Sequence, residues 1–271
     1  MKSIIQKFLL KYLPELYYAI ASWRFFNRCK KKFQDFQHAF FVKVYDTRSL
    51  TVLSGPFIGL AYFNKIVWGP ITPKWIGSYE EELHEVTNTI IARRYAKIID
   101  VGAAEGYYAV GLAYKCPKSN VVSYDIDPIA RHRQKQLAAL NNLQNLEIRK
   151  FCSHDELRLQ IIENCFILSD IEGFELELID PVKCPQLKTC DILIEVHQSN
   201  GLEIHEVESA IANRFTGTHS ISRFGVTTRI PEHYQNTVTE LKCISLVEID
   251  AALDEHRDAR QRWLWLEAIK A

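Results

Sequence analysis

Carboxylate side chains stand at the ends of four short apolar segments of this chain, and one of these ends also carries a histidine. Carboxylates accept hydrogen bonds from hydroxyl groups, bind cations and move protons, and imidazole titrates near neutral pH. The carboxyl ends of parallel strands meet at one edge of a sheet, so these groups are expected to share a rim. They are Asp100, Asp125, Asp170, Glu195 and His197.

The first of these ends leads into a glycine-rich turn. Residues 96–101 (AKIIDV) form a short apolar run typical of a buried parallel strand, and Gly102–Gly106 (GAAEG) follows. The Ala-rich segment Tyr107–Lys115 then predicts a helix. A strand, turn and helix in this order present free N–H groups to a ligand, and glycines at 102 and 106 predict close approach of that ligand to the backbone.

Asp125 lies nineteen residues after Gly106, at the end of the predicted second strand. A carboxylate near this distance from such a turn accepts hydrogen bonds from the ribose hydroxyls of a nucleotide cofactor. A dinucleotide site would need glycine where Ala104 stands, and Asp100 would repel a pyrophosphate. The residues therefore favour S-adenosylmethionine over NAD. An NAD-dependent oxidoreductase and a binding protein without activity are the alternatives from other functional classes.

Strands and helices alternate from residue 96 onward, which predicts a doubly wound α/β sheet with helices on both faces. A helix is also expected from Ser78 to Arg94, with Ser78 as N-cap and Glu81 completing a capping box. The expected strands are 96–101, Asn120–Tyr124, Leu146–Lys150, Cys165–Ser169, Asp191–Val196, Thr218–Phe224 and Arg262–Leu266. The other expected helices are Tyr107–Lys115, Pro128–Asn142, His154–Glu163 and Glu203–Phe215.

The 271 residues divide into an N-terminal extension, 1–76, and an α/β domain, 77–271. Residues 1–40 have the apolar period of one or two amphipathic helices, and 41–76 predict an irregular segment or a hairpin.

Residues 1–50 hold 10 Lys and Arg against 3 Asp and Glu, whereas the other 221 hold 23 against 30. The basic helices predict either packing on the body or a second subunit, or binding to an anionic membrane surface. The acidic body disfavours nucleic acid.

The seven cysteines are scattered and include no CxxC pair. This pattern favours reduced thiols over a disulfide framework or a structural zinc site. Lys7 and Lys11 interrupt the apolar start, so no signal peptide is predicted, and charges break the best candidate for a membrane span. A cytoplasmic protein is expected, with the inner membrane surface as the alternative location.

Four segments, DVGAAEGYYAVGLA, YDIDP, SDIEGFE and IEVH, resemble the motifs of class I S-adenosylmethionine-dependent methyltransferases, most closely those of the FkbM type. The resemblance spans about residues 78–225. It implies a Rossmann-like sheet of seven strands with helices on both faces, in which Arg262–Leu266 is an inserted antiparallel strand. Where an Asn is frequent in that family, this chain has Ala104-Glu105, which leaves the role of Glu105 open. The implied cofactor-binding residues are Asp100, Gly102, Ala103, Glu105, Gly106, Asp125, Ile126, Cys152, Ser153 and Asp170. Among them, the resemblance implies that the residues after the third strand, Cys152 to Asp155, lie near the adenine.

Methyl transfer to a hydroxyl group needs a group that removes the acceptor's proton. We predict His197 as this base, with Asp170 and Glu195 as further catalytic residues; alternatively, these three residues hold Mg²⁺. Glu172 and Glu175 are other candidates, or else cap the following helix. The sequence Asp170-Ile-Glu-Gly replaces the [DN]-P-P-[FY] segment of many amino-group methyltransferases, which favours oxygen as acceptor. The resemblance implies a saccharide or glycolipid; a small metabolite or a protein side chain is the alternative.

Overall fold

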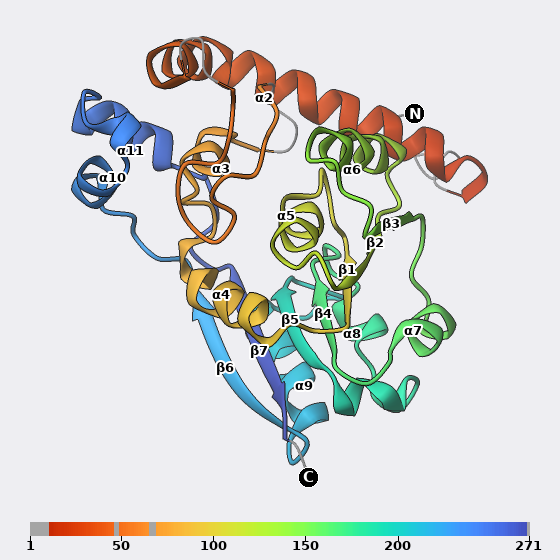
Figure 1. Cartoon of the computed structure of the whole chain (residues 1–271). Helices are drawn as coiled ribbons and strands as arrows, with labels where there is room; N and C mark the ends of the chain where they lie inside the picture. Colours follow the sequence, from red (N-terminus) through yellow and green to blue (C-terminus); the bar gives the residue numbers. More distant parts are fainter. Residues whose placement is uncertain (1–10, 46–48, 65–68, 270–271) are drawn as a thin grey trace.

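A seven-stranded sheet forms the centre of the molecule in the computed structural model, which describes residues 11–45, 49–64 and 69–269 (Figure 1). Within α2, the side chains of residue 22 and residues 25–35 are not described. The strands are β1 (Lys97–Val101), β2 (Asn120–Tyr124), β3 (Leu146–Arg149), β4 (Cys165–Ser169), β5 (Asp191–Val196), β6 (His219–Gly225) and β7 (Arg262–Ala268).

The strand order is β3-β2-β1-β4-β5-β7-β6. Strands β1 to β5 are parallel, and β7 is inserted antiparallel between β5 and β6. This order confirms the predicted Rossmann-like methyltransferase sheet, including the antiparallel position of residues 262–266. The register aligns the strand ends, because Val101 pairs with both Tyr124 and Ser169. The loops that follow β1, β2 and β4 therefore leave the same edge of the sheet.

Helices cover both faces of the sheet (Figure 1). On one face, Ile98, Val121 and Phe166 pack in a cluster with residues of α4, α5 and α6; on the other, Ile99 and Val122 pack with residues of α7, α8 and α9. The helices after the extension are α4 (His84–Arg93), α5 (Tyr107–Lys115), α6 (Pro128–Leu140), α7 (His154–Gln160), α8 (Glu175–Leu178), α9 (Ile204–Phe215), α10 (Pro231–Thr237) and α11 (Leu246–Leu253). Three short 3₁₀ helices span Glu81–Leu83, Pro185–Thr189 and Thr239–Leu241.

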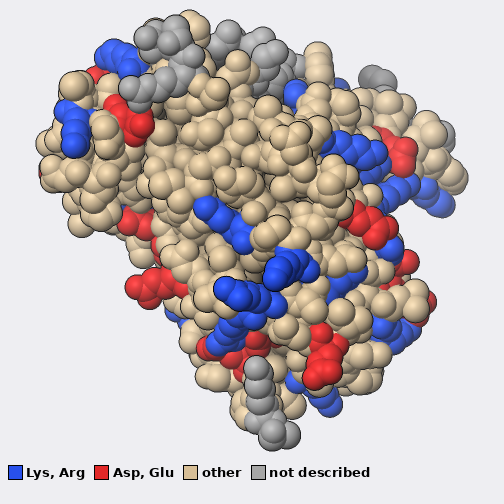
Figure 2. Space-filling view, in the orientation of Figure 1, with Lys and Arg blue, Asp and Glu red and all other residues tan. Residues whose placement is uncertain are grey.

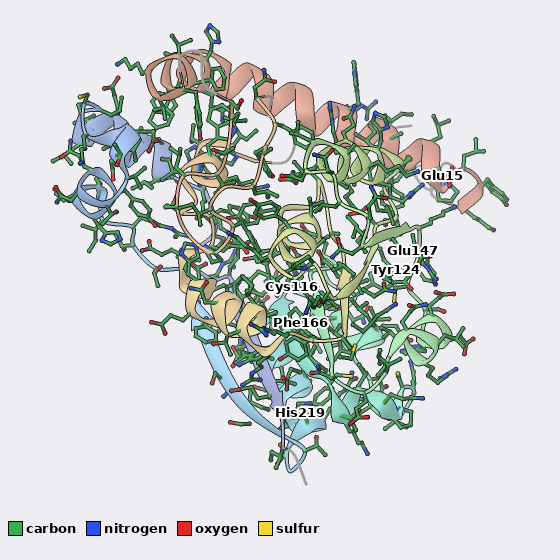
Figure 3. The ribbon with its side chains drawn as sticks, in the orientation of Figure 1. Glu15, Cys116, Tyr124, Glu147, Phe166 and His219 are labelled. Atoms are coloured by element: carbon green, nitrogen blue, oxygen red, sulfur yellow. The ribbon has the colours of Figure 1, made fainter. Side chains whose placement is uncertain are left out.

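The alternation of buried strand residues explains these two clusters. Every residue of β1, β4 and β5 is buried, as expected for strands covered on both faces. Phe166, labelled in Figure 3, packs against Tyr95 and Trp265 on one face, whereas its neighbours Cys165 and Ile167 belong to the opposite cluster. Successive residues point to opposite faces of the sheet, so each apolar strand supplies both cores.

The N-cap predicted at Ser78 is wrong. Ser78 is fully buried, and its hydroxyl group donates to the carbonyl oxygen of Pro73, at a distance of 3.5 Å. Helix α4 begins only at His84, after the 3₁₀ turn Glu81–Leu83, and neither has a side-chain cap at its N-terminus. The chain reverses around Ser78 because α3 (Thr72–Ile76) ends there in a left-handed Gly77. The hydroxyl group therefore bonds back to α3 instead of forward.

Residues 49–64 are irregular, with one isolated antiparallel bridge between Thr51 and Ala61. Phe57, Leu60 and Tyr62 from this segment are buried in the core. The irregular segment expected over residues 41–76 is confirmed for 49–64, whereas residues 41–45 belong to α2 and 72–76 form α3.

Helix α2 (Pro14–Tyr45) runs across the top of the molecule in Figure 1. Its C-terminal residues Phe40, Val44 and Tyr45 are buried in the core, and its N-terminal Glu15 forms an ion pair of 2.8 Å with Lys150 (Figure 3). The apolar positions predicted at residues 4–9 lie outside the described residues. Within the described chain, no helix combines the length and apolar character that crossing a membrane requires. On the face shown in Figure 2, charged side chains of both signs are interspersed.

Candidate active site

The turn after β1 lies against the loop after β4. Gly102 has a φ of +87°, and a Cβ atom there would lie 1.6 Å from the carbonyl oxygen of Asp170. Gly106 has a φ of +100°, and a Cβ atom there would meet the side chains of Val110 and Gln134. Both positions therefore require glycine because of their own backbone angle and their contacts within the protein. The sequence predicted that a ligand comes close to the backbone at these glycines. In the structure, it is the loop after β4 that comes close to the backbone at Gly102.

Asp125 holds the turn from the next strand end. Its two carboxylate oxygens accept hydrogen bonds from the N–H groups of Ala104 and Asp127, each at 2.8 Å. Burial raises the pKa of Asp125 to about 7, although these two amide hydrogen bonds act in the opposite direction. Each carboxylate oxygen can accept a second hydrogen bond. Asp125 is thus placed, as predicted, beside the glycine-rich turn, with acceptor capacity left for a ligand.

Asp100 is buried beneath the same turn, with an exposed fraction of 1%. Neither of its carboxylate oxygens has a partner with full hydrogen-bond geometry among the described residues, although the N–H group of Ala109 is close enough to act on its pKa. Burial and the charge of Asp125 raise its pKa to about 8, which the nearby N–H group of Ala109 only partly offsets. A buried carboxylate without a partner is costly. A cationic group placed beside Asp100 would remove this cost.

Glu105 faces the N-terminal extension. Its carboxylate accepts a hydrogen bond of 2.9 Å from the hydroxyl group of Tyr62 and forms a buried ion pair with Lys74 of α3. The ammonium group of Lys74 also lies 4.7 Å from the ring centre of Tyr79. In the structure, Glu105 therefore holds Tyr62 and Lys74 against the turn.

The loop after β3 contains the residues expected near an adenine ring. Cys152 is buried, and the hydroxyl group of Ser153 accepts a hydrogen bond of 3.2 Å from the N–H group of Glu156, which caps α7. Two apolar side chains are exposed at the neighbouring strand ends, Ile126 by 38% and Phe151 by 64%. Ile126 was predicted as a cofactor contact, whereas Phe151 was not, although it directly follows the third strand.

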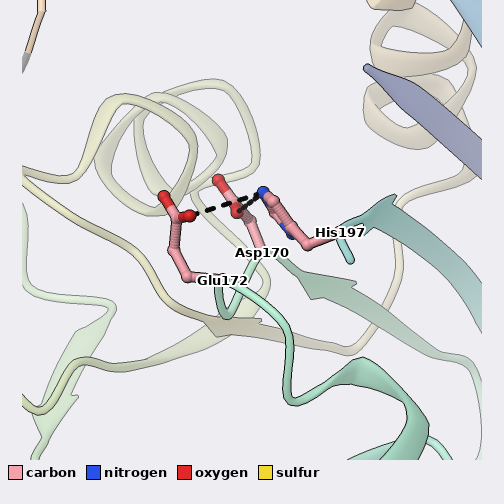
Figure 4. A group of neighbouring side chains, drawn as sticks. All are labelled: Asp170, Glu172 and His197. Atoms are coloured by element: carbon pink, nitrogen blue, oxygen red, sulfur yellow. Dashed lines mark ion pairs between the residues drawn. The ribbon is translucent and has the colours of Figure 1, made fainter. Parts of the chain in front are cut away.

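Asp170, Glu172 and His197 converge at the ends of β4 and β5 (Figure 4). The Nε2 atom of His197 lies 3.7 Å from Oδ1 of Asp170 and 3.7 Å from Oε2 of Glu172. Its Nδ1 atom forms a hydrogen bond of 2.8 Å with Oε1 of Glu175, which is fully buried. The same oxygen of Glu175 accepts from the N–H groups of Ile171 and Gly173. Neither Glu172 nor Glu175 caps α8 with its side chain, as one alternative expected.

The surroundings of His197 favour its charged form. Burial alone would lower its pKa, but the hydrogen bond with Glu175 and the charges of Asp170, Glu175 and Glu172 outweigh burial and raise the pKa above the usual value. Burial and the charge of Glu195 raise the pKa of Asp170 well above its normal range. This end of the rim, like Asp100, therefore stabilises positive charge.

Glu195 belongs to a different group, which we call the arginine-paired cluster. Arg257 lies 2.9 Å from Glu80 and 2.7 Å from Glu195, and Arg229 lies 3.1 Å from Glu82. Burial raises the pKa of Glu195 and of Glu255 to about 8, against the arginine charges that lower it. The cluster consists of Glu80, Glu82, Glu195, Glu255, Arg229 and Arg257, whose side chains are 10% exposed or less.

The sequence did not identify most of this cluster. Glu80 and Glu82 lie within the helix expected from Ser78 to Arg94, and Arg257 precedes the expected last strand, Arg262–Leu266. Arg257 and Glu80 are 177 positions apart, so no local pattern connects them. One signal was present: three consecutive glutamates, residues 80–82, precede a segment whose first apolar residue is buried.

No protein-family model and no curated protein sequence matches this chain. Among solved structures, an rRNA methylase from Streptococcus thermophilus has 10% identity and a TM-score of 0.46, covering 70% of this chain and 97% of its own. An O-methyltransferase from Bacillus cereus, in complex with SAH, has 12% identity and a TM-score of 0.45, covering 66% and 77%. A ribosomal protein L11 methylase from Lactobacillus delbrueckii subsp. bulgaricus has 16% identity and a TM-score of 0.38, covering 68% and 79%.

Proposed function

We propose that this protein is an S-adenosylmethionine-dependent methyltransferase that methylates a hydroxyl group. The observation that carries the proposal is the excess of carboxylates over basic side chains at the carboxyl edge of the sheet. Four glutamates share two arginines in the arginine-paired cluster, and Asp100 and Asp170 have no cationic side chain bonded to them among the described residues, apart from the histidine near Asp170. A site of this charge is complementary to a cofactor with an ammonium and a sulfonium group.

The residues on this edge fit such a cofactor along its length. Asp100 offers a buried carboxylate to the methionine end, Asp125 offers acceptor oxygens to the ribose, and Ile126 offers an exposed apolar surface beside it. We assign the adenine to the loop that carries Phe151 and Cys152. The cofactor supplies an electrophilic methyl group; the protein positions the acceptor and accepts its proton. NAD would place a pyrophosphate near Asp100, which repels it.

The acceptor is assigned to the end of the rim at Asp170, Glu172 and His197. Carboxylates and an imidazole bind hydroxyl groups. The [DN]-P-P-[FY] segment that many amino-group methyltransferases carry after the fourth strand is absent from the sequence after β4. The narrower assignment, a saccharide or glycolipid acceptor and membership of the FkbM type, rests on the resemblance of the four motifs. Acceptors of a different kind, a small metabolite or a protein side chain, remain outcomes of the test below.

Calorimetric titration tests the cofactor. We expect S-adenosylhomocysteine to bind and NAD not to bind under the same conditions. Binding of NAD without binding of S-adenosylhomocysteine would contradict the proposal and favour an oxidoreductase. Absence of binding by either ligand would favour a protein that keeps the fold without this cofactor.

Labelled methyl transfer tests the acceptor. The protein and S-adenosylmethionine with a labelled methyl group are incubated with three pools: glycolipids and oligosaccharides, small metabolites, and proteins. We expect label in the first pool, released as an O-methyl sugar on acid hydrolysis and identified by mass spectrometry. Label confined to either of the other pools would retain the methyltransferase and exclude the saccharide.

For the location of the acceptor, we infer an anionic membrane surface. The first 50 residues carry a formal charge of +7, and four large apolar side chains around the start of α2 are 48% to 62% exposed. They are Tyr12, Leu13, Leu16 and Trp23. Basic charge beside exposed apolar side chains is the combination that binds anionic lipids. Co-sedimentation with anionic vesicles should fall strongly in Leu16→Glu/Trp23→Glu. Equal pelleting of variant and parent protein would contradict this location.

A further inference from the structure

We propose that Asp170, Glu172 and His197 form a binding site for a divalent cation of the Mn²⁺ or Mg²⁺ class, with Glu175 holding His197 in the ligating orientation. The sequence suggested Asp170, Glu195 and His197 as a possible set; the geometry replaces Glu195 by Glu172. The inference deepens the proposed function, because such an ion would hold the acceptor oxygen at the same end of the rim.

The distances from the imidazole of His197 to the two carboxylates are those of ligands that share an ion. One ligand atom from each residue lies within 4.8 Å of the others, and Nε2 of His197 is 3.7 Å from each carboxylate oxygen. A separation of 3.7 Å is too long for a hydrogen bond. Two atoms about 2.1 to 2.2 Å from one ion, at angles of about 90 to 120°, are roughly 3.0 to 3.8 Å apart. The observed spacing therefore fits an ion better than direct hydrogen bonding.

The surroundings of His197 support this assignment independently. Glu175 is fully buried, bonds Nδ1 of His197 at 2.8 Å, and is itself held by the N–H groups of Ile171 and Gly173. A carboxylate behind the histidine fixes the ring and leaves Nε2 facing the other two acids, as in histidine ligands of metal sites. The second oxygen of Glu175 and Oδ1 of Asp170 are buried without a hydrogen-bond partner among the described residues. Unsatisfied buried acceptors at both ends of the imidazole indicate missing positive charge.

Glu195 is excluded from the ligand set by its partners. Its Oε1 atom lies 2.7 Å from Arg257 and accepts from Gln261 at 3.0 Å. Glu172 has no such restraint: its side chain is 88% exposed and Nε2 of His197 is within 3.7 Å. An exposed third ligand leaves the remaining coordination positions open toward solvent. One imidazole and two carboxylates suit Mn²⁺, and Mg²⁺ more weakly because of the nitrogen ligand.

The test is titration of the full chain with MnCl₂, following free Mn²⁺ by its electron paramagnetic resonance signal. We expect one site in the parent protein. Glu172→Gln should weaken Mn²⁺ binding at least tenfold, and Asp170→Asn should weaken it further. Glu177→Gln is the matched control, because Glu177 is an exposed glutamate on the neighbouring helix paired with Lys183. Glu175→Gln should cost about 10- to 100-fold in affinity, the range for a residue that orients a ligand.

Two results would overturn the site: no Mn²⁺ binding by the parent protein, or the same affinity in Glu172→Gln and Glu177→Gln. Because Glu172 is exposed, Glu172→Gln is expected to fold, and its circular dichroism melting curve checks this. Binding of S-adenosylhomocysteine, measured on the same samples without metal, separates this inference from the proposed function. Metal binding without cofactor binding would contradict the function alone, and cofactor binding without metal binding would contradict the site alone.

Discussion

Two groups of buried acids lie along the carboxyl edge of the sheet, and they differ in their partners. In the arginine-paired cluster, four glutamates surround Arg229 and Arg257. Asp100 and Asp170, by contrast, form no ion pair with an Arg or Lys side chain among the described residues, and the nearest basic group to Asp170 is the imidazole of His197. The acids of the first group have arginine partners within the chain itself. In the proposed function, the cationic partner of the second group is the bound ligand, so the two groups contrast scaffold with proposed ligand site.

The largest effect is expected from breaking the paired group. Arg257→Met leaves Glu80 and Glu195 buried without their shared cation, and loss of one partner of a buried ion pair costs about 3 to 5 kcal/mol. Urea denaturation of the protein without ligands measures this loss. Arg223→Met is the control, because Arg223 pairs with Glu208 at the surface, where an exposed pair contributes about 0 to 1 kcal/mol. Equal losses would mean that burial does not distinguish the two pairs.

The next largest effect is expected at Asp125. This carboxylate has no arginine partner, but it accepts hydrogen bonds from two backbone N–H groups, so it is intermediate between the two groups. Asp125→Ala should weaken binding of S-adenosylhomocysteine by roughly 30- to 100-fold, equivalent to about 2 to 3 kcal/mol for a charged acceptor. Calorimetry measures this change. Glu163→Ala, which changes an exposed acid in the loop before β4, at the opposite edge of the sheet, should leave the affinity unchanged. An unaltered affinity in Asp125→Ala would remove the ribose from this position.

Asp100→Asn should increase stability while weakening cofactor binding. The pKa of Asp100 is about 8 in the folded chain, against 3.8 for an unperturbed aspartate, so the unfolded chain releases this proton first as the pH rises. The free energy of unfolding of the parent protein therefore falls as the pH rises from about 4 to about 8. Asn has no proton to release, so the variant should gain about 1 to 3 kcal/mol over the parent protein at pH 8.5 and little at pH 4. Denaturation at both pH values, without ligand, checks the sign.

If Asp100→Asn is equally stable at the two pH values relative to the parent protein, Asp100 is not strained in the unliganded state. The argument for a missing cation would then lose its strongest support. Increased stability together with unchanged cofactor affinity would mean that Asp100 is strained but does not face the ligand.

The sequence was sufficient for the sheet and for one side of the site. Strands such as Asn120–Tyr124 and Asp191–Val196 were predicted to the residue, because apolar runs bounded by turns are local signals. The acidic rim followed from the ends of those strands. The arginine-paired cluster did not, because Glu80, in the segment before α4, and Arg257, in the loop before β7, meet only in the folded chain. Likewise, Ser78 has the sequence of an N-cap, and only its burial against α3 shows otherwise.

The smallest effect should come from a polar group that is already satisfied. Ser153 was predicted near the adenine, but its hydroxyl group caps α7. Ser153→Ala should lower the free energy of unfolding by about 1 kcal/mol, the usual contribution of an N-cap. It should change affinity for S-adenosylhomocysteine less than twofold, because a hydroxyl group held by the helix has little to offer the cofactor. A loss of affinity as large as that of Asp125→Ala would show that a polar group already hydrogen-bonded within the protein also binds the ligand. The absence of protein partners would then not be enough to identify the residues of the site.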